Sequence, residues 1–182
     1  MLFDAVRAVG MELCPALGIG IPVGKDSLSM QSRFQAADGR VRAAVSPVSL
    51  IVTAFARVED VRGQLTPMLN REVESELWLI GLGAGQRRMG GSILGQCYDG
   101  FGGAVPDLDE PATLRSFFDL IQEARADDLL LAYHERSDGG AFAALCEMAF
   151  ASHLGLELNL DGWGEDAFRT LFNEELGAIV QV

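Results

Sequence analysis

Small and apolar residues recur at helical spacing at the start of the chain. Four of them stand at positions i, i+3, i+4 and i+7 and predict an opening helix: Val6, Val9, Gly10 and Leu13. The residue before a proline is driven out of the helical region of backbone space. We therefore expect this helix to end at Cys14-Pro15.

The next segments follow an extended pattern. A short strand is predicted over residues 19–23. Asp38-Gly39 is a tight-turn signal, so the segments on either side of it are expected to form antiparallel strands. The second of these, over 45–56, is apolar on both faces from Val48 onward, which indicates a strand that is covered on both sides.

A polar stretch with glycine and proline breaks follows over residues 59–76. Such composition is typical of a domain boundary. We place two domains, 1–70 and 71–182.

Beyond this boundary, strand and helix patterns alternate, which predicts a layered α/β sheet with helices packed on it, after a first part of α+β character. One helix is expected to open at Asp109 and Pro111 with Leu114, Phe117, Phe118 and Ile121 on its apolar face. The next is expected to begin at Asp138 with Phe142, Leu145, Cys146 and Ala149 inward. The other expected elements are strands over 77–80, 129–133 and 178–182 and helices over 93–97 and 166–175.

Composition narrows the function classes. The 182 residues include 26 acidic and 14 basic ones, a formal net charge of −12, and Lys25 is the only lysine. Nucleic-acid grooves need clustered cations, so we expect no nucleic-acid partner. No apolar run approaches the ~18–20 residues that span a bilayer, and the first residues lack the order of a secretion signal. A cytoplasmic protein without a membrane partner is expected.

The cysteines and the chain ends carry further expectations. Cys14, Cys97 and Cys146 lie far apart without a CxxC pair, which favours reduced, buried thiols. The chain opens inside a helical pattern without an N-cap and stops on an apolar strand pattern. We interpret it as a fragment of a longer polypeptide, with a complete domain as the alternative.

Two glycine-rich segments fail the tests for common nucleotide motifs. Gly24-Lys25 is not a P-loop, because Ile19 stands at the required glycine and Asp26 at the required Ser or Thr. The run that begins at Gly81 has Arg88 where a dinucleotide fingerprint needs glycine.

The segment from Gly24 to Ser29 nevertheless combines an open backbone with charge. A cation, a carboxylate and two hydroxyls follow a glycine, and the cation is Lys25. Either this is a ligand-binding point, or it is an ordinary hairpin entry with a solvated lysine.

The second candidate is the run from His134 to Gly140, at the point where a predicted strand ends and a helix begins. Ser137 is a plausible N-cap, and the free amides of residues 138–140 would suit a phosphate. Glu135 could ligand Mg²⁺. The alternative is a capped helix with a solvated Glu135-Arg136 pair. His134 is expected to be a structural histidine and His153 a cap at a helix end.

Four separated motifs resemble phosphoribosylformylglycinamidine synthases of the long, single-chain form. They are the runs over 21–30, 46–50, 131–140 and 172–178. The resemblance extends over essentially the whole chain. It implies the end of a second sheet domain followed by most of an α/β domain similar to that of aminoimidazole ribonucleotide synthetase.

The resemblance also implies an activity. It is the ATP-dependent amidation of formylglycinamide ribonucleotide with ammonia from a glutaminase domain, in purine biosynthesis. ATP activates the formamide oxygen for attack. The glutaminase cysteine and the other nucleotide-binding half lie outside this segment, so the fragment alone is expected to be inactive.

The resemblance also implies roles for individual residues of this chain. Short-form relatives have Gly-Gly-Asn-Val-Ser at positions 23–27, which implies ATP binding for Gly24 and substrate binding for Ser27. Lys25 stands at the metal-binding Asn; a cation cannot ligand a metal, so contact with a phosphate of ATP is expected. In the long form, a His-Asp-Arg-Ser-Asp-Gly-Gly run holds Mg²⁺ and a structural ADP. The matching residues are Glu135, whose carboxylate reaches about 1.5 Å further out than that of Asp, and Ser137.

Three functions stay open at this point. The chain could complete a synthetase active site through Gly24 to Ser27, or it could be a non-catalytic module that holds ADP as a structural element. It could also be a free-standing small-molecule kinase of the same superfamily.

Overall fold

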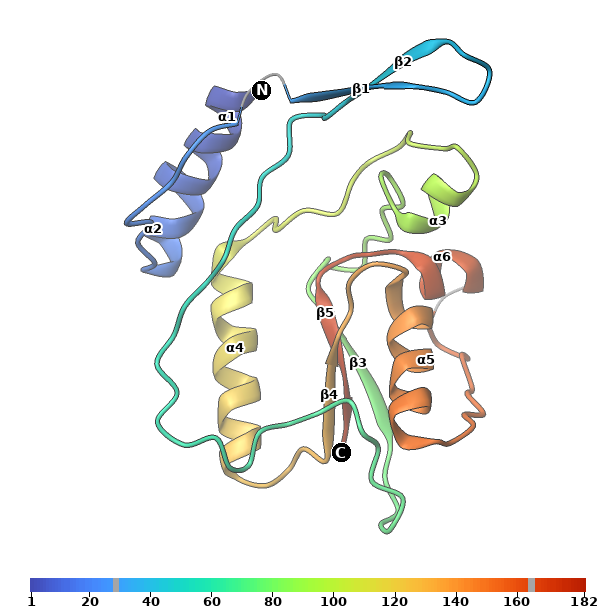
Figure 1. Ribbon diagram of the computed structural model, residues 1–182. Helices are drawn as coiled ribbons and strands as arrows, with labels where there is room; N and C mark the ends of the chain where they lie inside the picture. The colour runs from blue at the N-terminus through green and yellow to red at the C-terminus, as the bar shows by residue number, and fades with distance from the viewer. Residues whose placement is uncertain (28–29, 164–165) are drawn as a thin grey trace. The chain divides into compact units, whose positions relative to one another are not determined.

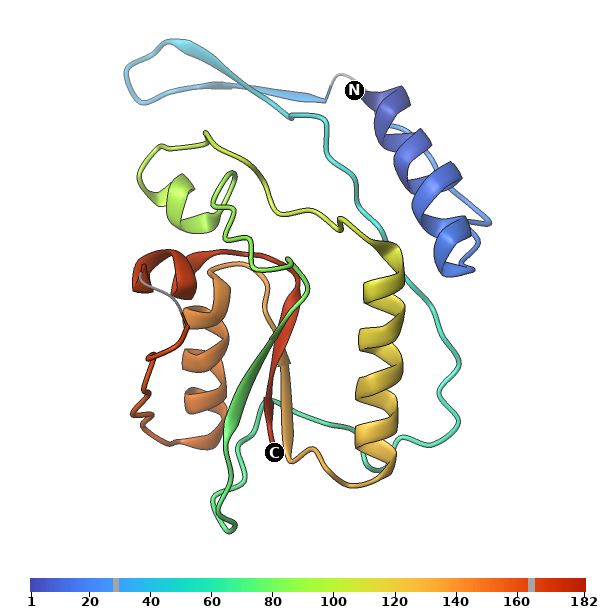
Figure 2. The same cartoon turned by 180° about the vertical axis from the view of Figure 1, so that it is seen from behind.

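The computed structural model describes residues 1–27, 30–163 and 166–182 (Figure 1), and Figure 2 shows the chain from behind. The chain divides into two compact units, Met1–Glu59 and Asp60–Val182.

The first unit begins with a continuous helical segment. It comprises α1 (Leu2–Arg7), the π-helical stretch η1 (Ala8–Leu13) and α2 (Cys14–Leu17), and it ends at Gly18 with a left-handed φ of 71°. The predicted end at Cys14-Pro15 is therefore wrong. Pro15 directly follows Cys14, the C-cap of the π-helical stretch, whose amide bonds the carbonyl of Val9, and the helix continues past Pro15 to Leu17.

The first unit also contains the predicted hairpin. Strand β1 (Gln31–Gln35) pairs antiparallel with β2 (Val41–Val45). The turn is closed by a hydrogen bond of 2.8 Å from the amide of Gly39 to the carbonyl of Ala36. This confirms the turn signal at Asp38-Gly39.

Two other predicted strands of this unit do not form. Residues 19–23 and 46–58 have no regular structure. In the hairpin register Val45 pairs with Gln31, the first residue of β1, and the amide of Ser46 bonds the carbonyl of Met30 at 2.9 Å; among the described residues the ladder goes no further. A β-ladder needs a partner, and apolar character alone does not supply one.

The second unit is built on a three-stranded antiparallel sheet in the order β3-β5-β4. The strands are β3 (Leu77–Gly81), β4 (Ala132–Glu135) and β5 (Gly177–Gln181). The strands near 77 and 178 are confirmed, and the strand predicted over 129–133 forms three residues later. The pairing of Glu135 with Ala178 sets that position.

Helices cover the sheet and confirm the layered α/β fold. Helices α4 and α5 lie on opposite sides of the strands (Figures 1 and 2). Ser92 caps α3, Glu110 caps α4 in place of the predicted Asp109, and Asp166 caps α6. The helices are α3 (Ile93–Cys97), α4 (Pro111–Ala126), α5 (Gly140–Ser152) and α6 (Ala167–Phe172).

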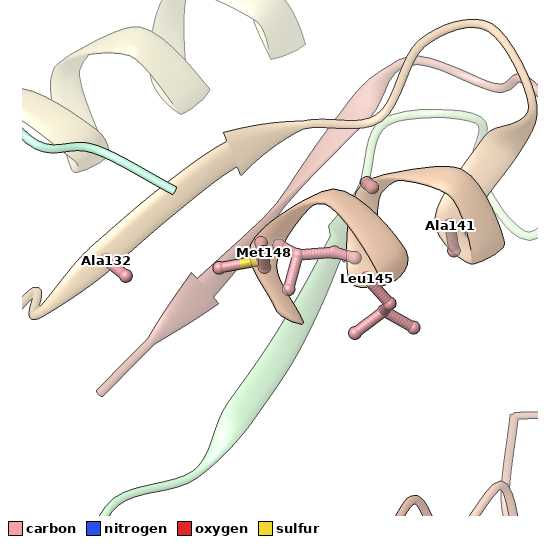
Figure 3. Close-up of a cluster of buried hydrophobic side chains, with 6 residues drawn as sticks. Ala132, Ala141, Leu145 and Met148 are labelled. Carbon is pink, nitrogen blue, oxygen red and sulfur yellow. The ribbon is translucent and has the colours of Figure 1, made fainter. Parts of the chain in front are cut away.

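The core lies between α5 and the sheet (Figure 3). Of the face predicted for α5, only Leu145 belongs to it, and Phe142 is 48% exposed and packs against Phe172 at 5.1 Å between ring centroids. Because α5 is apolar on most sides, spacing alone could not choose its inner face. Alanines let the helix approach the sheet closely. The core residues are Ala132, Ala141, Ala144, Leu145, Met148 and Ile179.

The face predicted for α4 is buried only in part. Ile121 is buried, but Phe118 is 60% exposed.

The polar stretch before β3 packs on the second unit. Gln181, on the central strand, exchanges two hydrogen bonds of 2.6 and 2.7 Å with the backbone of Asn70, and the amide of Tyr133 bonds the carbonyl of Thr66 at 3.0 Å. The second unit thus begins at Asp60, whereas the sequence placed the boundary near residue 70.

Two further expectations concern cysteines and membranes. The three cysteines are free thiols, but Cys97 is exposed and Cys14 and Cys146 are half-buried, so the expectation of buried thiols is wrong. Within the described ranges, no helix has the length and apolar character that crossing a membrane requires.

Candidate functional site

The first group of predicted site residues lies on an exposed, irregular segment of the first unit. Gly24, Lys25 and Ser27 are all exposed, and the ammonium of Lys25 donates a hydrogen bond to the hydroxyl of Ser27. A Cβ added at Gly24 would meet no atom within 4 Å. The segment thus presents a cation and a hydroxyl together on open backbone. Ser29, the second hydroxyl of this motif, lies outside the described residues.

The second group lies in the second unit, at the turn between β4 and α5. Ser137 is exposed in this turn, two residues after the end of β4, and its carbonyl accepts the amide of Gly140 at 3.0 Å. The predicted N-cap at Ser137 is wrong, because the capping position is Gly139, with a left-handed φ of 82°.

The start of α5 is occupied by a carboxylate. Glu174 Oε1 accepts the amides of Gly139 and Ile93, both at 2.8 Å. The sequence predicted that the amides of residues 138–140 could bind a phosphate. The amides of Gly139 and Gly140 already have acceptors within the chain. Only the amide of Asp138 makes no hydrogen bond to the described residues. The carboxylate of Glu174 supplies the charge that a helix N-terminus favours.

The glycine after this cap has no room for a side chain. Gly140 has a φ of 68°, and a Cβ there would lie 2.6 Å from the carbonyl oxygens of both Leu171 and Asn173. The close approach of α5 to the segment before β5 explains why glycine stands at this position.

Glu135 does not form a metal site with the residues around it. Its side chain is 69% exposed, and Nδ1 of His134 lies 4.0 Å from its Oε2. No three of His, Cys, Asp and Glu come together in the described ranges in a way that could hold a metal ion. One exposed carboxylate does not hold Mg²⁺.

His134 is a structural histidine, as predicted. Its Nε2 lies 2.6 Å from a carboxylate oxygen of Glu147 on α5, so it ties β4 to that helix. His153 caps the C-terminus of α5 in a left-handed conformation, also as predicted.

Arg136 is buried and does not form the solvated pair with Glu135 that the sequence allowed. It is 7% exposed. Its Nε donates to the carbonyl of Glu175 at 2.5 Å, and its Nη2 donates to the carbonyl of Leu176 at 3.0 Å. These bonds fasten the turn after β4 to the start of β5.

Arg88 and Glu175 form a buried ion pair beside this contact. Arg88 donates to the Glu175 carboxylate through Nε and Nη2, both at 2.7 Å, and through its backbone amide at 2.9 Å. Asp109 accepts two further bonds of 3.0 Å from the same guanidinium. The ion pair therefore joins the segments before α3, before α4 and before β5.

The titration of these groups follows from their contacts. Burial by itself raises the pKa of Glu175, but the hydrogen bonds from Arg88 outweigh this and hold the pKa below its ordinary value. The same bonds raise the pKa of Arg88, and burial lowers the pKa of Arg136. Tyr133, on β4, has a pKa raised to about 12 by burial and by the charge of Glu135.

The structure therefore brings together part of the predicted site. Glu135 and Ser137 share one turn, and Gly24, Lys25 and Ser27 share one segment of the other unit. Sequence reasoning missed Glu174 as a cap and Arg136 as an anchor. Their partners lie 35 and 39 residues away, and no local spacing rule reaches that far.

Two family models match the chain in series. Residues 1–57 match the FGAR-AT PurM_N-like domain, and residues 74–181 match the C-terminal domain of AIR synthase related proteins. The first match lies inside Met1–Glu59 and the second inside Asp60–Val182. The second match covers more than half of the chain. Its sheet and covering helices agree with an α/β fold like that of AIR synthase, and the chain belongs to the family of AIR synthase related proteins.

Proposed function

We propose that this chain is a segment of a phosphoribosylformylglycinamidine synthase, the enzyme that amidates formylglycinamide ribonucleotide with glutamine-derived ammonia and ATP in purine biosynthesis. The observation that carries the proposal is the serial match. An FGAR-AT PurM_N-like domain precedes an AIR synthase related C-terminal domain in one chain. The PurM superfamily to which both domains point consists of ATP-using enzymes.

In this proposal the segment from Gly24 to Ser27 faces ATP and the substrate. Ser27 binds formylglycinamide ribonucleotide, and Gly24 lets a phosphate of ATP approach the backbone. Lys25 contacts that phosphate with its ammonium. The exposure of the segment and the bond from Lys25 to Ser27 support it, because both groups can turn to a ligand without breaking a packed contact.

The turn between β4 and α5 is the proposed ADP contact. The exposed hydroxyl of Ser137 is available to a phosphate oxygen, whereas the amide of Gly139 is held by Glu174. Mg²⁺ would neutralise phosphate charge when bound. Glu135 can contribute only one ligand, and in the proposal the remaining ligands come from other parts of the enzyme, as does the glutaminase.

The test uses the longer polypeptide that contains this chain. Lys25→Ala and Ser27→Ala are each expected to lower ammonia-dependent amidation about a hundredfold, because each would remove a ligand contact, while the circular dichroism spectrum stays unchanged. The control is Ser49→Ala, since Ser49 is exposed and its hydroxyl bonds the nearby carbonyl of Pro47. Turnover at the wild-type rate in both variants would refute the assignment. The 182-residue chain alone is expected to show no amidation.

A structural role for ADP is the second candidate. It is favoured by the position of Ser137 in the turn that Arg136 and Glu174 fasten to the start of β5. In the longer polypeptide, Ser137→Ala would then lower the melting temperature with bound ADP but leave turnover unchanged. Loss of turnover at an unchanged melting temperature would contradict the structural role.

A further inference from the structure

A pocket of about 270 Å³ opens in the second unit beside the turn between β4 and α5, and Arg136 of that turn lines it. Its walls come from the end of β3, the glycine-rich segment after it, the segment before α6, and α6 itself. Trp163 and Leu79 supply apolar surface, and both pack against the core. The pocket shares no residue with the sites proposed above.

Two guanidinium groups line this pocket, those of Arg87 and Arg136. The lining includes no Asp or Glu among the residues that the structure describes. The carboxylate of Glu175 is already engaged by three hydrogen bonds from Arg88. In a chain with a net charge of −12, two positive charges thus meet at one pocket, and the nearby Glu175 offsets part of them.

Arg136 lines the pocket and has one donor that no described residue engages. Its Nε and Nη2 are fixed on the carbonyls of Glu175 and Leu176, and its Nη1 makes no hydrogen bond to the described residues. The two fixed bonds hold the guanidinium plane, so Nη1 is oriented before any ligand arrives. Burial of this guanidinium outweighs the favourable charge of the nearby Glu175, and an anion in contact with it would lower the cost of burial.

Arg87 and the glycine-rich segment extend the same surface. Arg87 Nη2 donates to the carbonyl of Trp163 at 2.5 Å, which leaves its Nε and Nη1 for a ligand. Gly85 lines the pocket and Ala84 precedes it; their φ values are positive, 80° and 49°, and their amides make no hydrogen bond to the described residues. Adjacent amides in such turns form anion-binding concavities.

We propose that this pocket binds the phosphate group of a small metabolite, held by Arg87 and by Nη1 of Arg136. The chemistry fits because planar guanidinium groups pair with phosphate oxygens through charge-assisted bonds. The size fits too: a pocket of about 270 Å³ is below the usual range for drug-sized ligands but holds a phosphate with a few carbon atoms.

The first experiment uses the full 182-residue chain and inorganic phosphate as the probe. At constant ionic strength, phosphate is expected to shift the amide resonances of Gly85 and Gly162 and the indole resonance of Trp163. Sodium chloride at the same ionic strength should not shift them. No phosphate-dependent shift at these residues would overturn the proposal, and this readout needs no variant that could fail to fold.

The second experiment removes one guanidinium. Arg87→Met should weaken phosphate binding about tenfold or more in calorimetry, because a charge-assisted bond is lost. The matched control is Arg71→Met, since Arg71 is 71% exposed and lies outside the pocket. Equal affinity in wild type and Arg87→Met would overturn the proposal.

A third comparison identifies the source of the phosphate. Ribose 5-phosphate should bind more tightly than inorganic phosphate if the ligand is a phosphorylated metabolite, and equal affinity would overturn that part. Neither result depends on the ADP contact at Ser137, so Ser137→Ala should leave phosphate binding unchanged. A loss of phosphate binding in Ser137→Ala would show that the probe reports the turn and not this pocket.

Discussion

The two units differ in how they use apolar side chains. In Met1–Glu59 none of the described residues is buried, and Ile51 and Phe55 are 91% and 93% exposed. In Asp60–Val182 the central strand is buried from Ala178 to Gln181 and α5 packs on it. Apolar periodicity therefore produces a core only where the chain also supplies an opposing surface.

The same contrast holds for charge. The first unit carries exposed pairs such as Arg57 with Glu59, at 3.7 Å and more than four-fifths exposed on both sides. The second contains Arg88 with Glu175, whose side chains are 11% and 1% exposed. Exposed ion pairs contribute little to the free energy of unfolding, whereas removal of one member of a buried pair lowers it strongly.

Removing the buried carboxylate should give the largest effect. We expect Glu175→Ala to lower the free energy of unfolding of the second unit by about 3 kcal/mol, because Arg88 would lose its buried partner and keep only the more exposed Asp109. Urea unfolding followed by tryptophan fluorescence measures this, since Trp78 and Trp163 both lie in the second unit. Glu59→Ala is the matched control in the exposed pair and should leave the unfolding midpoint unchanged. Equal midpoints for wild type and Glu175→Ala would contradict the structural role of the pair.

Two glycine substitutions compare the stability cost of an added Cβ in the two units. Gly140 and Gly39 have similar φ values, 68° and 78°, but only Gly140 has backbone atoms within 4 Å of an added Cβ. Gly39→Ala should therefore cost about 1 kcal/mol, from the left-handed backbone alone. Gly140→Ala should cost about 3 kcal/mol, because α5 must also move away from the carbonyls of Leu171 and Asn173.

Hydrogen exchange of the strand amides measures the first substitution, and urea unfolding measures the second. If both variants lost the same stability, the close packing at Gly140 would not be a determinant of the fold.

The smallest expected effect is a pH dependence. The pKa of Glu175 is lowered in the folded state, so its contribution to stability is present above the unfolded pKa, near 4.5, and is lost as pH falls through the folded value. The free energy of unfolding should therefore fall below about pH 4.5, and it should fall less steeply in Glu175→Gln. Parallel pH profiles for wild type and Glu175→Gln between about pH 3 and 6 would show that this carboxylate does not control acid stability.

Sequence reasoning located the elements whose signals are local. The hairpin at Asp38-Gly39, the strand from Leu77 and the helix over 93–97 all form where turn residues and short apolar runs predicted them. Strand β4 was predicted three residues too early, because pairing with β5 fixes its register. The strand predicted over 45–56 did not form beyond Val45, because its partner there, Gln31, is the first residue of β1.

The candidate site, too, was predictable where its signals are local and not where they depend on distant residues. Sequence reasoning identified the turn with Glu135 and Ser137, since a strand-to-helix change and paired glycines are visible locally. It could not identify Glu174 as the group that holds the amide of Gly139, or the burial of Arg136, because both contacts join residues more than thirty positions apart.

The sequence by itself determined that this is an acidic α/β chain of two parts, with its single lysine beside Gly24, and it pointed to the family through motifs. The tertiary structure alone decided which face of α5 is buried and which carboxylates meet arginines. It also decided that Arg87 and Arg136 share one pocket. Burial, ion pairing and pocket formation are properties of segments brought together by the packing of the sheet, and no periodicity within one segment encodes its partner.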